Sequence, residues 1–241
     1  MEQAGEIVDS SVAFTTAPAV AAAHELKSPL ALLRQLSLQL QQEDLSPTQR
    51  RLTERMVLTA ERALRTTTDL TKSARLDDAM FDLEPINPEQ VCRDIVHELG
   101  PLFEAHNRQL KVQSRRHPLL LVGNRDLLRR ILANFSDNAL HYTEPGTAVH
   151  FQISALKQSG RVRIGVRDFG PAVSSDVWRQ LQSRLQSAPQ PIHARPQSSG
   201  LGLYLASQFA AAMNGTIGVT RHRDGATFYV DLHASSQIQL L

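Results

Sequence analysis

Residues 21–40 read AAAHELKSPLALLRQLSLQL and have the spacing of a packed helix. One leucine register repeats every seven residues, and it holds Leu26, Leu33 and Leu40, with Leu36 between the last two. This is the heptad pattern of a helix that packs against another helix. His24 comes two residues before the first of these leucines, so its side chain is predicted to face outward. Because Pro29 cannot donate to the carbonyl of Glu25, the helix is expected to bend beside His24.

A second amphipathic segment follows and predicts a helical hairpin. Its two seven-residue registers hold Leu52, Thr59 and Thr66, and Met56, Ala63 and Leu70. Between the helices, Ser46 and Gln49 form a capping box around Pro47, which suits the first helical position. These features predict two antiparallel helices with a turn near residues 44–46. Two helices cannot bury both faces alone, so a second copy is expected to complete a four-helix bundle. The alternative is a monomeric hairpin packed on the rest of the chain.

Composition excludes several classes of protein. The 241 residues carry 26 basic and 24 acidic side chains, for a net charge of +2, which argues against a dedicated nucleic-acid surface. The single cysteine, Cys92, excludes an internal disulfide and a zinc site built from cysteines. No run approaches the ~18 apolar residues of a membrane span. The apolar stretch at residues 12–23 lacks a basic leader, so we expect no signal peptide.

The pattern changes after residue 76 and predicts a two-layer α+β domain. A short strand and helix cap occur in FDLEPINPEQ, where Pro88 lies just inside the next helix. Helical patterns cover residues 91–107, 124–141, 174–187 and 201–213. Strand patterns cover residues 109–114, 118–122, 147–156, 161–168 and 215–232, the last as a hairpin. The segment SAPQPIHARPQSSG reads as a loop.

Three clusters in this second part carry candidate chemistry. Asn134 and Asn138 share one helical face, where carboxamides can offer oxygens to magnesium and N–H groups to phosphate. Asp168 ends a strand, where a carboxylate can accept a hydrogen bond from an exocyclic amine. Gly200 and Gly202 open a helix, where backbone N–H groups can approach a phosphate. Taken singly, each cluster has an ordinary reading as helix surface, turn or loop.

Taken together and in this order, the motifs resemble those of bacterial sensor histidine kinases. HELKSPL resembles their phosphoacceptor box, NFSDNALHYT their asparagine box, and DFGPAV and SSGLGLYLA their two glycine boxes. The resemblance covers residues from about 17 to 232. It implies a dimeric helical hairpin followed by a two-layer α/β sandwich of the GHKL ATP-binding type, shared with gyrase and Hsp90. It divides the chain into a lead-in (1–16), a phosphotransfer hairpin (17–76), an ATP-binding domain (77–235) and a tail (236–241).

The resemblance also implies the activity and the residues that carry it. His24 would be phosphorylated from ATP, with Glu25 as its acid/base partner, and the phosphoryl group would pass to an aspartate of a response regulator. Ser28 would orient a water for a phosphatase reaction. The residues that bind the nucleotide would be Asn134, Asn138, His141, Tyr142, Asp168, Gly170, Gly200, Leu201 and Gly202. Asn138 would be the ligand of Mg²⁺. The partners would be a second copy and the regulator's receiver domain, in the cytoplasm, with the chain acting alone or as part of a membrane-bound sensor.

Several residues depart from the family pattern. His141 stands where a lysine is usual, and a neutral imidazole offers less positive charge to phosphates than an ammonium group. Ala172, which follows Pro171, and Ser198 stand where glycines are usual. These departures keep open a nucleotide-binding but catalytically weak scaffold that docks a regulator. An ATPase clamp is a third hypothesis, but it has no need for the histidine hairpin.

Overall fold

A computed structural model describes residues 10–73, 76, 82–113, 119–170, 178–179 and 201–236, without the side chains of residues 10–20 and 141. The chain divides into two compact units, Met1–Ala79 and Met80–Leu241. The helix predicted near residues 174–187 lies outside the described residues, apart from residues 178 and 179, and so does the loop that follows it.

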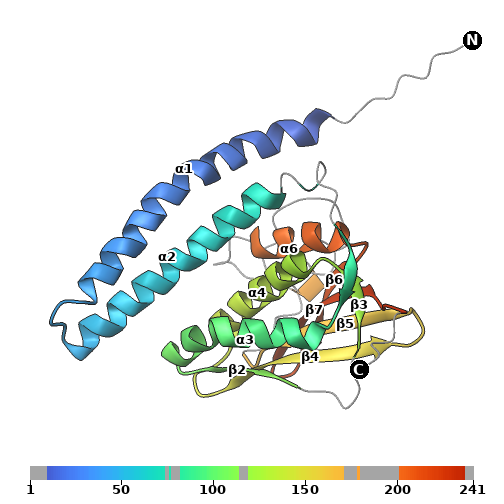
Figure 1. Ribbon diagram of the computed structural model, residues 1–241. Helices are drawn as coiled ribbons and strands as arrows, with labels where there is room; N and C mark the ends of the chain where they lie inside the picture. Colours follow the sequence, from blue (N-terminus) through green and yellow to red (C-terminus); the bar gives the residue numbers. More distant parts are fainter. Residues whose placement is uncertain are drawn as a thin grey trace, which may run out of the picture. The chain divides into compact units, whose positions relative to one another are not determined.

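The first unit contains a helical hairpin of α1 (Ser10–Leu40) and α2 (Pro47–Ser73). The predicted capping box is confirmed. The Ser46 N–H donates to Gln49 Oε1 at 3.0 Å, and the Gln49 N–H donates to Ser46 Oγ at 3.4 Å. Helix α1 continues through Pro29, and Figure 1 shows a gradual curve along the helix instead of a break. The expected bend is therefore spread along the helix, because the turns on either side of Pro29 keep their hydrogen bonds.

Small and polar side chains line the contact between the two helices. Those that are buried are Ala23 and Ser37 of α1 and Thr53, Val57, Ala60, Thr67 and Thr71 of α2. Lys27 donates to Thr71 at 3.4 Å, and Arg34 pairs with Glu61 at 2.8 Å, so the helices run antiparallel. The leucine register is not part of this contact, since Leu26 is 51% exposed and Leu36 is 54% exposed.

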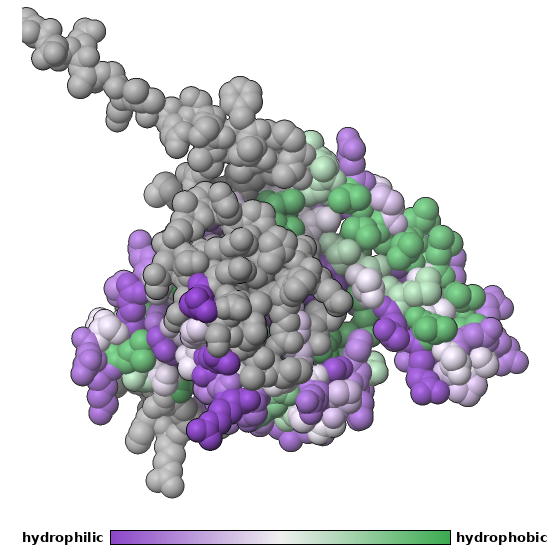
Figure 2. Space-filling model, turned by 180° about the vertical axis from the view of Figure 1, so that it is seen from behind, coloured by the Kyte–Doolittle hydropathy of each residue, from purple (hydrophilic) through white to green (hydrophobic). Residues whose placement is uncertain are grey.

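The exposed leucines form a stripe beside the inner contact, and we call it the leucine stripe: Leu26, Leu33, Leu36 and Leu40. At 3.6 residues per turn, its register lies roughly a quarter of a turn around α1 from the buried residues. Leu52 and Met56 of α2 are also exposed. Figure 2 shows hydrophobic side chains gathered on the surface of the hairpin. The heptad was therefore correctly identified, but within one chain it does not face α2.

The second unit contains the mixed sheet and its helices. Its elements are β1 (Glu84–Ile86), α3 (Pro88–Ala105), β2 (Gln109–Val112), β3 (Leu121–Gly123), α4 (Arg125–Tyr142), β4 (Ala148–Leu156), β5 (Arg161–Arg167), α6 (Leu201–Ala211), β6 (Thr216–His222) and β7 (Gly225–His233). Asn87 caps α3 by accepting from the Glu89 N–H at 3.0 Å, with Pro88 inside the helix as predicted. Asn124 caps α4 by accepting from the Leu127 N–H at 3.1 Å.

The strands form a five-stranded sheet in the order β2-β4-β5-β7-β6, in which only the β2–β4 pair is parallel among the described strands. Strands β1 and β3 pair separately. Helices α3, α4 and α6 cover one face of the sheet (Figure 1). Phe135 of α4 and Phe228 of β7 lie with ring centroids 6.0 Å apart inside this buried layer. This arrangement confirms the predicted two-layer α+β class.

Polar and aromatic side chains occupy the other face of the sheet. Arg163 of β5 makes two hydrogen bonds of 2.8 Å to Asp231 of β7, and its guanidinium lies 3.5 Å from the centroid of the Tyr229 ring. The pair raises the pKa of Arg163 above its ordinary value, chiefly through the hydrogen bonds to Asp231. None of the helices described here is long and apolar enough to cross a lipid bilayer.

Candidate active site

The candidate phosphoacceptor residues lie on α1 in the first unit. His24, Glu25 and Ser28 are all exposed, so the predicted outward position of His24 is confirmed. His24 and Ser28 are one helical turn apart and share a face. Lys27, between them, points instead toward α2, where it donates to Thr71. A reactant therefore has direct access to the His24 imidazole.

The two asparagines of α4 supply the most informative polar groups of the second unit. Asn134 is 9% exposed, and the Nδ2 atoms of Asn134 and Asn138 are buried without a hydrogen-bond partner in the described part of the chain. Buried N–H groups almost always have an acceptor, so two unpaired amides one turn apart need an explanation. Acceptor oxygens of a bound ligand would satisfy both.

Helix α6 approaches α4 at this same place. A Cβ built on Gly202 would lie 3.5 Å from Asn134 Oδ1. Leu201 is the first residue of α6 and is partly buried. Gly200 lies outside the described residues, as do Ala172, Ser198 and the side chain of His141.

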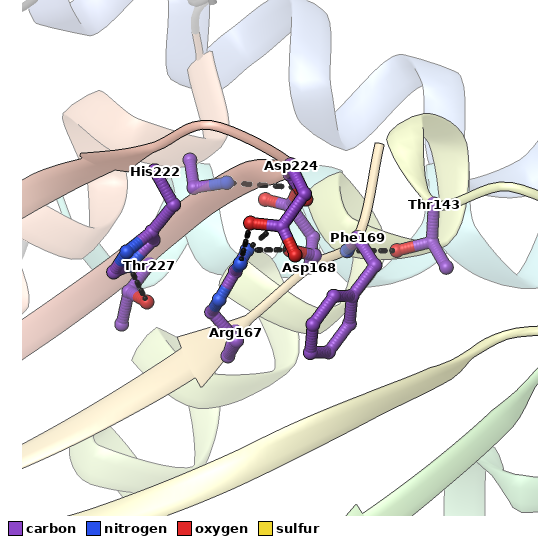
Figure 3. A network of polar contacts seen from close by, with 8 residues as sticks. Thr143, Arg167, Asp168, Phe169, His222, Asp224 and Thr227 are labelled. Atoms are coloured by element: carbon purple, nitrogen blue, oxygen red, sulfur yellow. Dashed lines mark hydrogen bonds and ion pairs between the residues drawn. The ribbon is translucent and has the colours of Figure 1, made fainter. Parts of the chain in front are cut away.

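Asp168 follows β5 and is held by the start of β7. Its side chain is among the buried charged groups, and the residue is 2% exposed. The Asp168 N–H donates to the Ala226 carbonyl at 2.9 Å, and Asp168 Oδ1 accepts from the Ala226 N–H at 3.1 Å (Figure 3). The backbone and the carboxylate of Asp168 are therefore both fixed by one residue of β7, Ala226.

The segment after Asp168 packs on the end of α4. A Cβ on Gly170 would lie 2.0 Å from the carbonyl oxygen of Tyr142, so only glycine permits this approach. The Phe169 N–H donates to Thr143 Oγ1 at 3.4 Å, and the Glu144 N–H donates to the Phe169 carbonyl at 3.1 Å. These contacts bring Tyr142, from the asparagine box, to Asp168 and Gly170, from the first glycine box.

Arg167 is a member of this site that the sequence patterns did not single out. Its Nη1 donates to the Asp168 carbonyl, and its Nη2 donates to Asp224 Oδ1 at 2.5 Å. The guanidinium lies 4.2 Å from the centroid of the Phe169 ring. The alternation of β5 places Arg163 and Arg167 on one face of the strand, and this repeated arginine was the signal available in the sequence.

Two histidines flank Arg167 and share its electrostatic environment. Burial, then Lys111 and Arg167, lowers the pKa of His150, whose ring meets Phe169 edge-on with centroids 5.9 Å apart. Burial and then Arg167 lower the pKa of His222, which contacts Thr227 Oγ1 at 2.8 Å. The lowered pKa of each ring favours its neutral form beside the Arg167 cation.

Comparison with known proteins finds similarity to histidine kinases along most of the chain. Residues 123–236 match the family described as histidine kinase-, DNA gyrase B-, and HSP90-like ATPase. The chain is 28% identical over 217 residues to the sensor protein GacS of Pseudomonas syringae. The matched region covers 87% of this chain and 24% of GacS. The chain is 27% identical over 208 residues to the histidine protein kinase SaeS of Staphylococcus epidermidis, covering 85% of this chain and 59% of SaeS.

A solved structure shows the same arrangement of elements. The crystal structure of full-length ShkA in complex with AMPPNP superposes with a TM-score of 0.65 at 26% identity, covering 93% of this chain and 47% of ShkA. The chain therefore spans less than two thirds of the length of each of these relatives. Residues 123–236 match the ATPase family above, and over most of its length the chain is similar to sensor histidine kinases.

Proposed function

We propose that this chain transfers the γ-phosphoryl group of ATP to the imidazole of His24 and then to an aspartate of a response regulator. The observation that carries the proposal is the pair of buried, unpartnered amide N–H groups of Asn134 and Asn138. A polyphosphate supplies the missing acceptor oxygens. The exposed His24 on α1 supplies a nucleophile.

The nucleotide site is proposed from residues that converge on the ends of α4 and β5. Asp168 would accept a hydrogen bond from the 6-amino group of adenine, and Tyr142 would lie against the base. Asn134 would donate to phosphate oxygens, together with His141. Gly170, Gly200, Leu201 and Gly202 would let the backbone pass close to the nucleotide.

The side-chain oxygen of Asn138 is a hard ligand that suits Mg²⁺. Among the described residues, no group of three or more histidine, cysteine, aspartate or glutamate side chains is placed to hold a metal. A magnesium ion would therefore be held by Asn138 and the nucleotide phosphates, where it would neutralise phosphate charge.

The chemical step uses the neutral imidazole of His24. One ring nitrogen attacks the γ-phosphorus in line, the N–P bond forms, and the bond to the ADP leaving oxygen breaks. Glu25 would accept the hydrogen bond, and then the proton, of the other ring nitrogen. The phosphoryl group would then move to the regulator's aspartate. In a phosphatase reaction, Ser28 would orient a water that hydrolyses this phosphoaspartate and releases inorganic phosphate. Because the substrates are intracellular, we place this core in the cytoplasm.

A labelling experiment tests the proposal. The chain is incubated with Mg²⁺ and γ-labelled ATP, and the product is then treated with acid and, separately, with base. Phosphohistidine is labile in acid, so the label should be lost in acid, kept in base, and absent from His24→Gln. ATP binding without label would instead support the catalytically weak scaffold. Acid-stable label would contradict a histidine acceptor.

A further inference from the structure

The turn between β6 and β7 packs closely against Asp168. Gly225, the first residue of β7 at the end of this turn, has a φ of +130°, and a Cβ there would lie 2.3 Å from the Asp168 carbonyl oxygen and 2.7 Å from Oδ1. The next residue, Ala226, makes both hydrogen bonds to Asp168 described above. The orientation of the Asp168 carboxylate therefore depends on where this turn lies.

Arg167 ties this turn to the end of β5 (Figure 3). Its Nη1 contacts the carbonyls of Asp168 and, at 3.4 Å, Asp224, and its Nη2 meets the Asp224 carboxylate. The Arg167 side chain is 8% exposed, whereas that of Asp224 is 67% exposed. A buried guanidinium has to keep its acceptors, because losing them would leave an uncompensated charge. Moving the turn would therefore be unfavourable, because the Arg167 guanidinium would lose these acceptors.

We propose that Arg167 is a positioning residue for recognition of the nucleotide base. It holds the Asp224–Gly225 turn against Asp168, so that the Ala226 N–H keeps Asp168 Oδ1 in place and the carboxylate presents a fixed acceptor to the 6-amino group of adenine. The inference rests on the proposed nucleotide site. If the inference is right, discrimination for adenine depends on Arg167, a side chain that does not touch the nucleotide.

The ring of Phe169 also helps to hold the Arg167 guanidinium in place. The ring lies under the guanidinium, and its own N–H is bonded to Thr143 Oγ1. An arginine stacked on an aromatic ring has its fork held in one plane. A lysine has no such fork, so Arg167→Lys should keep the charge but hold the turn less well.

The test compares two ligands that differ only in the group read by Asp168. ADP carries the 6-amino group, and purine riboside 5′-diphosphate lacks it. Affinities of the full chain for both are measured by calorimetry, and the readout is their ratio. In the native chain ADP should bind more tightly. Arg167→Gln should weaken ADP about tenfold, the size of one charge-assisted hydrogen bond, and should leave the analogue almost unchanged. Arg167→Lys should fall between the two.

Arg163→Gln is the matched control. Arg163 lies on the same face of the same strand, stacks on an aromatic ring and pairs with an aspartate, as Arg167 does. It contacts neither Asp168 nor the β6–β7 turn through any bond described here. Its loss should change stability without changing the ratio of the two affinities. Asp224→Asn, at an exposed position, removes the negative charge that pairs with Arg167 but keeps an acceptor oxygen, and it should reduce the ratio about threefold.

Equal weakening of both ligands by Arg167→Gln would mean that Arg167 is only structural and would overturn the inference. If Arg167→Gln does not fold, an unchanged ratio in both Asp224→Asn and Arg167→Lys would overturn it as well. A native chain that binds neither ligand, or does not distinguish them, would contradict the proposed nucleotide site itself.

Discussion

Gly202 of α6 faces the side-chain amide of Asn134 in α4, and a Cβ on Gly202 would lie 3.5 Å from Oδ1 and 3.8 Å from Cγ of that amide. The two residues come from different motifs that are well separated in the sequence of the second unit. This approach is how the start of α6 and the buried amides of α4 come to border one site.

Gly202→Ala should therefore fold but bind nucleotide less well. The added methyl group has an ordinary van der Waals distance to Asn134, and alanine favours a helix over glycine. It would, however, occupy space in front of the amide, so we expect ADP affinity to fall about threefold to tenfold. Gly100→Ala in α3 is the control, because a Cβ there meets nothing within 4 Å. It should leave ADP affinity unchanged. Calorimetry and thermal melting measure both.

Gly170→Ala should be far more damaging. Its Cβ would lie 2.0 Å from the Tyr142 carbonyl oxygen, which belongs to the backbone and cannot turn aside. We expect a loss of about 3 kcal/mol of stability, seen as a lower melting temperature, together with loss of ADP binding. A variant as stable as the native chain would show that the loop does not pack on α4 in this way.

His24→Ala and Asn138→Ala should separate the two halves of the proposed reaction. His24→Ala removes the acceptor, so labelling should disappear while ADP affinity stays within twofold. Asn138→Ala removes a proposed Mg²⁺ ligand, so magnesium-dependent binding should fall at least about tenfold. Binding is measured with and without Mg²⁺. If the two variants weakened ADP binding equally, this division of roles would be wrong.

Acid should destabilise the second unit through His150 and His222. Their folded pKa values are lowered below 6.5, chiefly by burial and then by nearby cations such as Arg167. Below about pH 6.5 the unfolded chain therefore binds more protons than the folded chain does. The stabilisation that is present above this pH is lost as the pH falls through the lowered pKa values of the folded chain. Melting temperature should drop between about pH 7.5 and about pH 5.5, and His150→Gln should flatten this dependence. His97→Gln, at an exposed position, should leave the pH dependence unchanged. If it flattened the pH dependence as much as His150→Gln, the acid effect would be general and this prediction would be wrong.

The leucine stripe predicts a homodimer. Leu33 and Leu36 are 46% and 54% exposed, and burying such side chains against a second hairpin would stabilise a four-helix bundle. Light scattering should give twice the mass of the chain. Leu33→Glu should shift it toward the monomer, whereas Gln35→Glu, on the opposite side of α1, should not. An active monomer would instead support the hairpin packed within one chain.

Local patterns were sufficient where the interactions are local. Ser46 and Gln49 predicted the start of α2, and Pro88 predicted the start of α3, because a cap is made by residues a few positions apart. The roles of Asp168 and of Asn134 and Asn138 stay predictions, although the structure shows how the three are held.

By itself, the sequence determined the helical hairpin, the strands, the two-layer class and the motifs, because periodicity and capping depend on neighbours along the chain. It did not decide which face of α1 meets α2, since a heptad looks the same whether its partner belongs to the same chain or to another. It also did not reveal Arg167, which reads as a solvated strand residue. Only the pairing of β5 with β7 brings Asp224 and Gly225 onto it, because contacts between strands join residues that are distant in sequence.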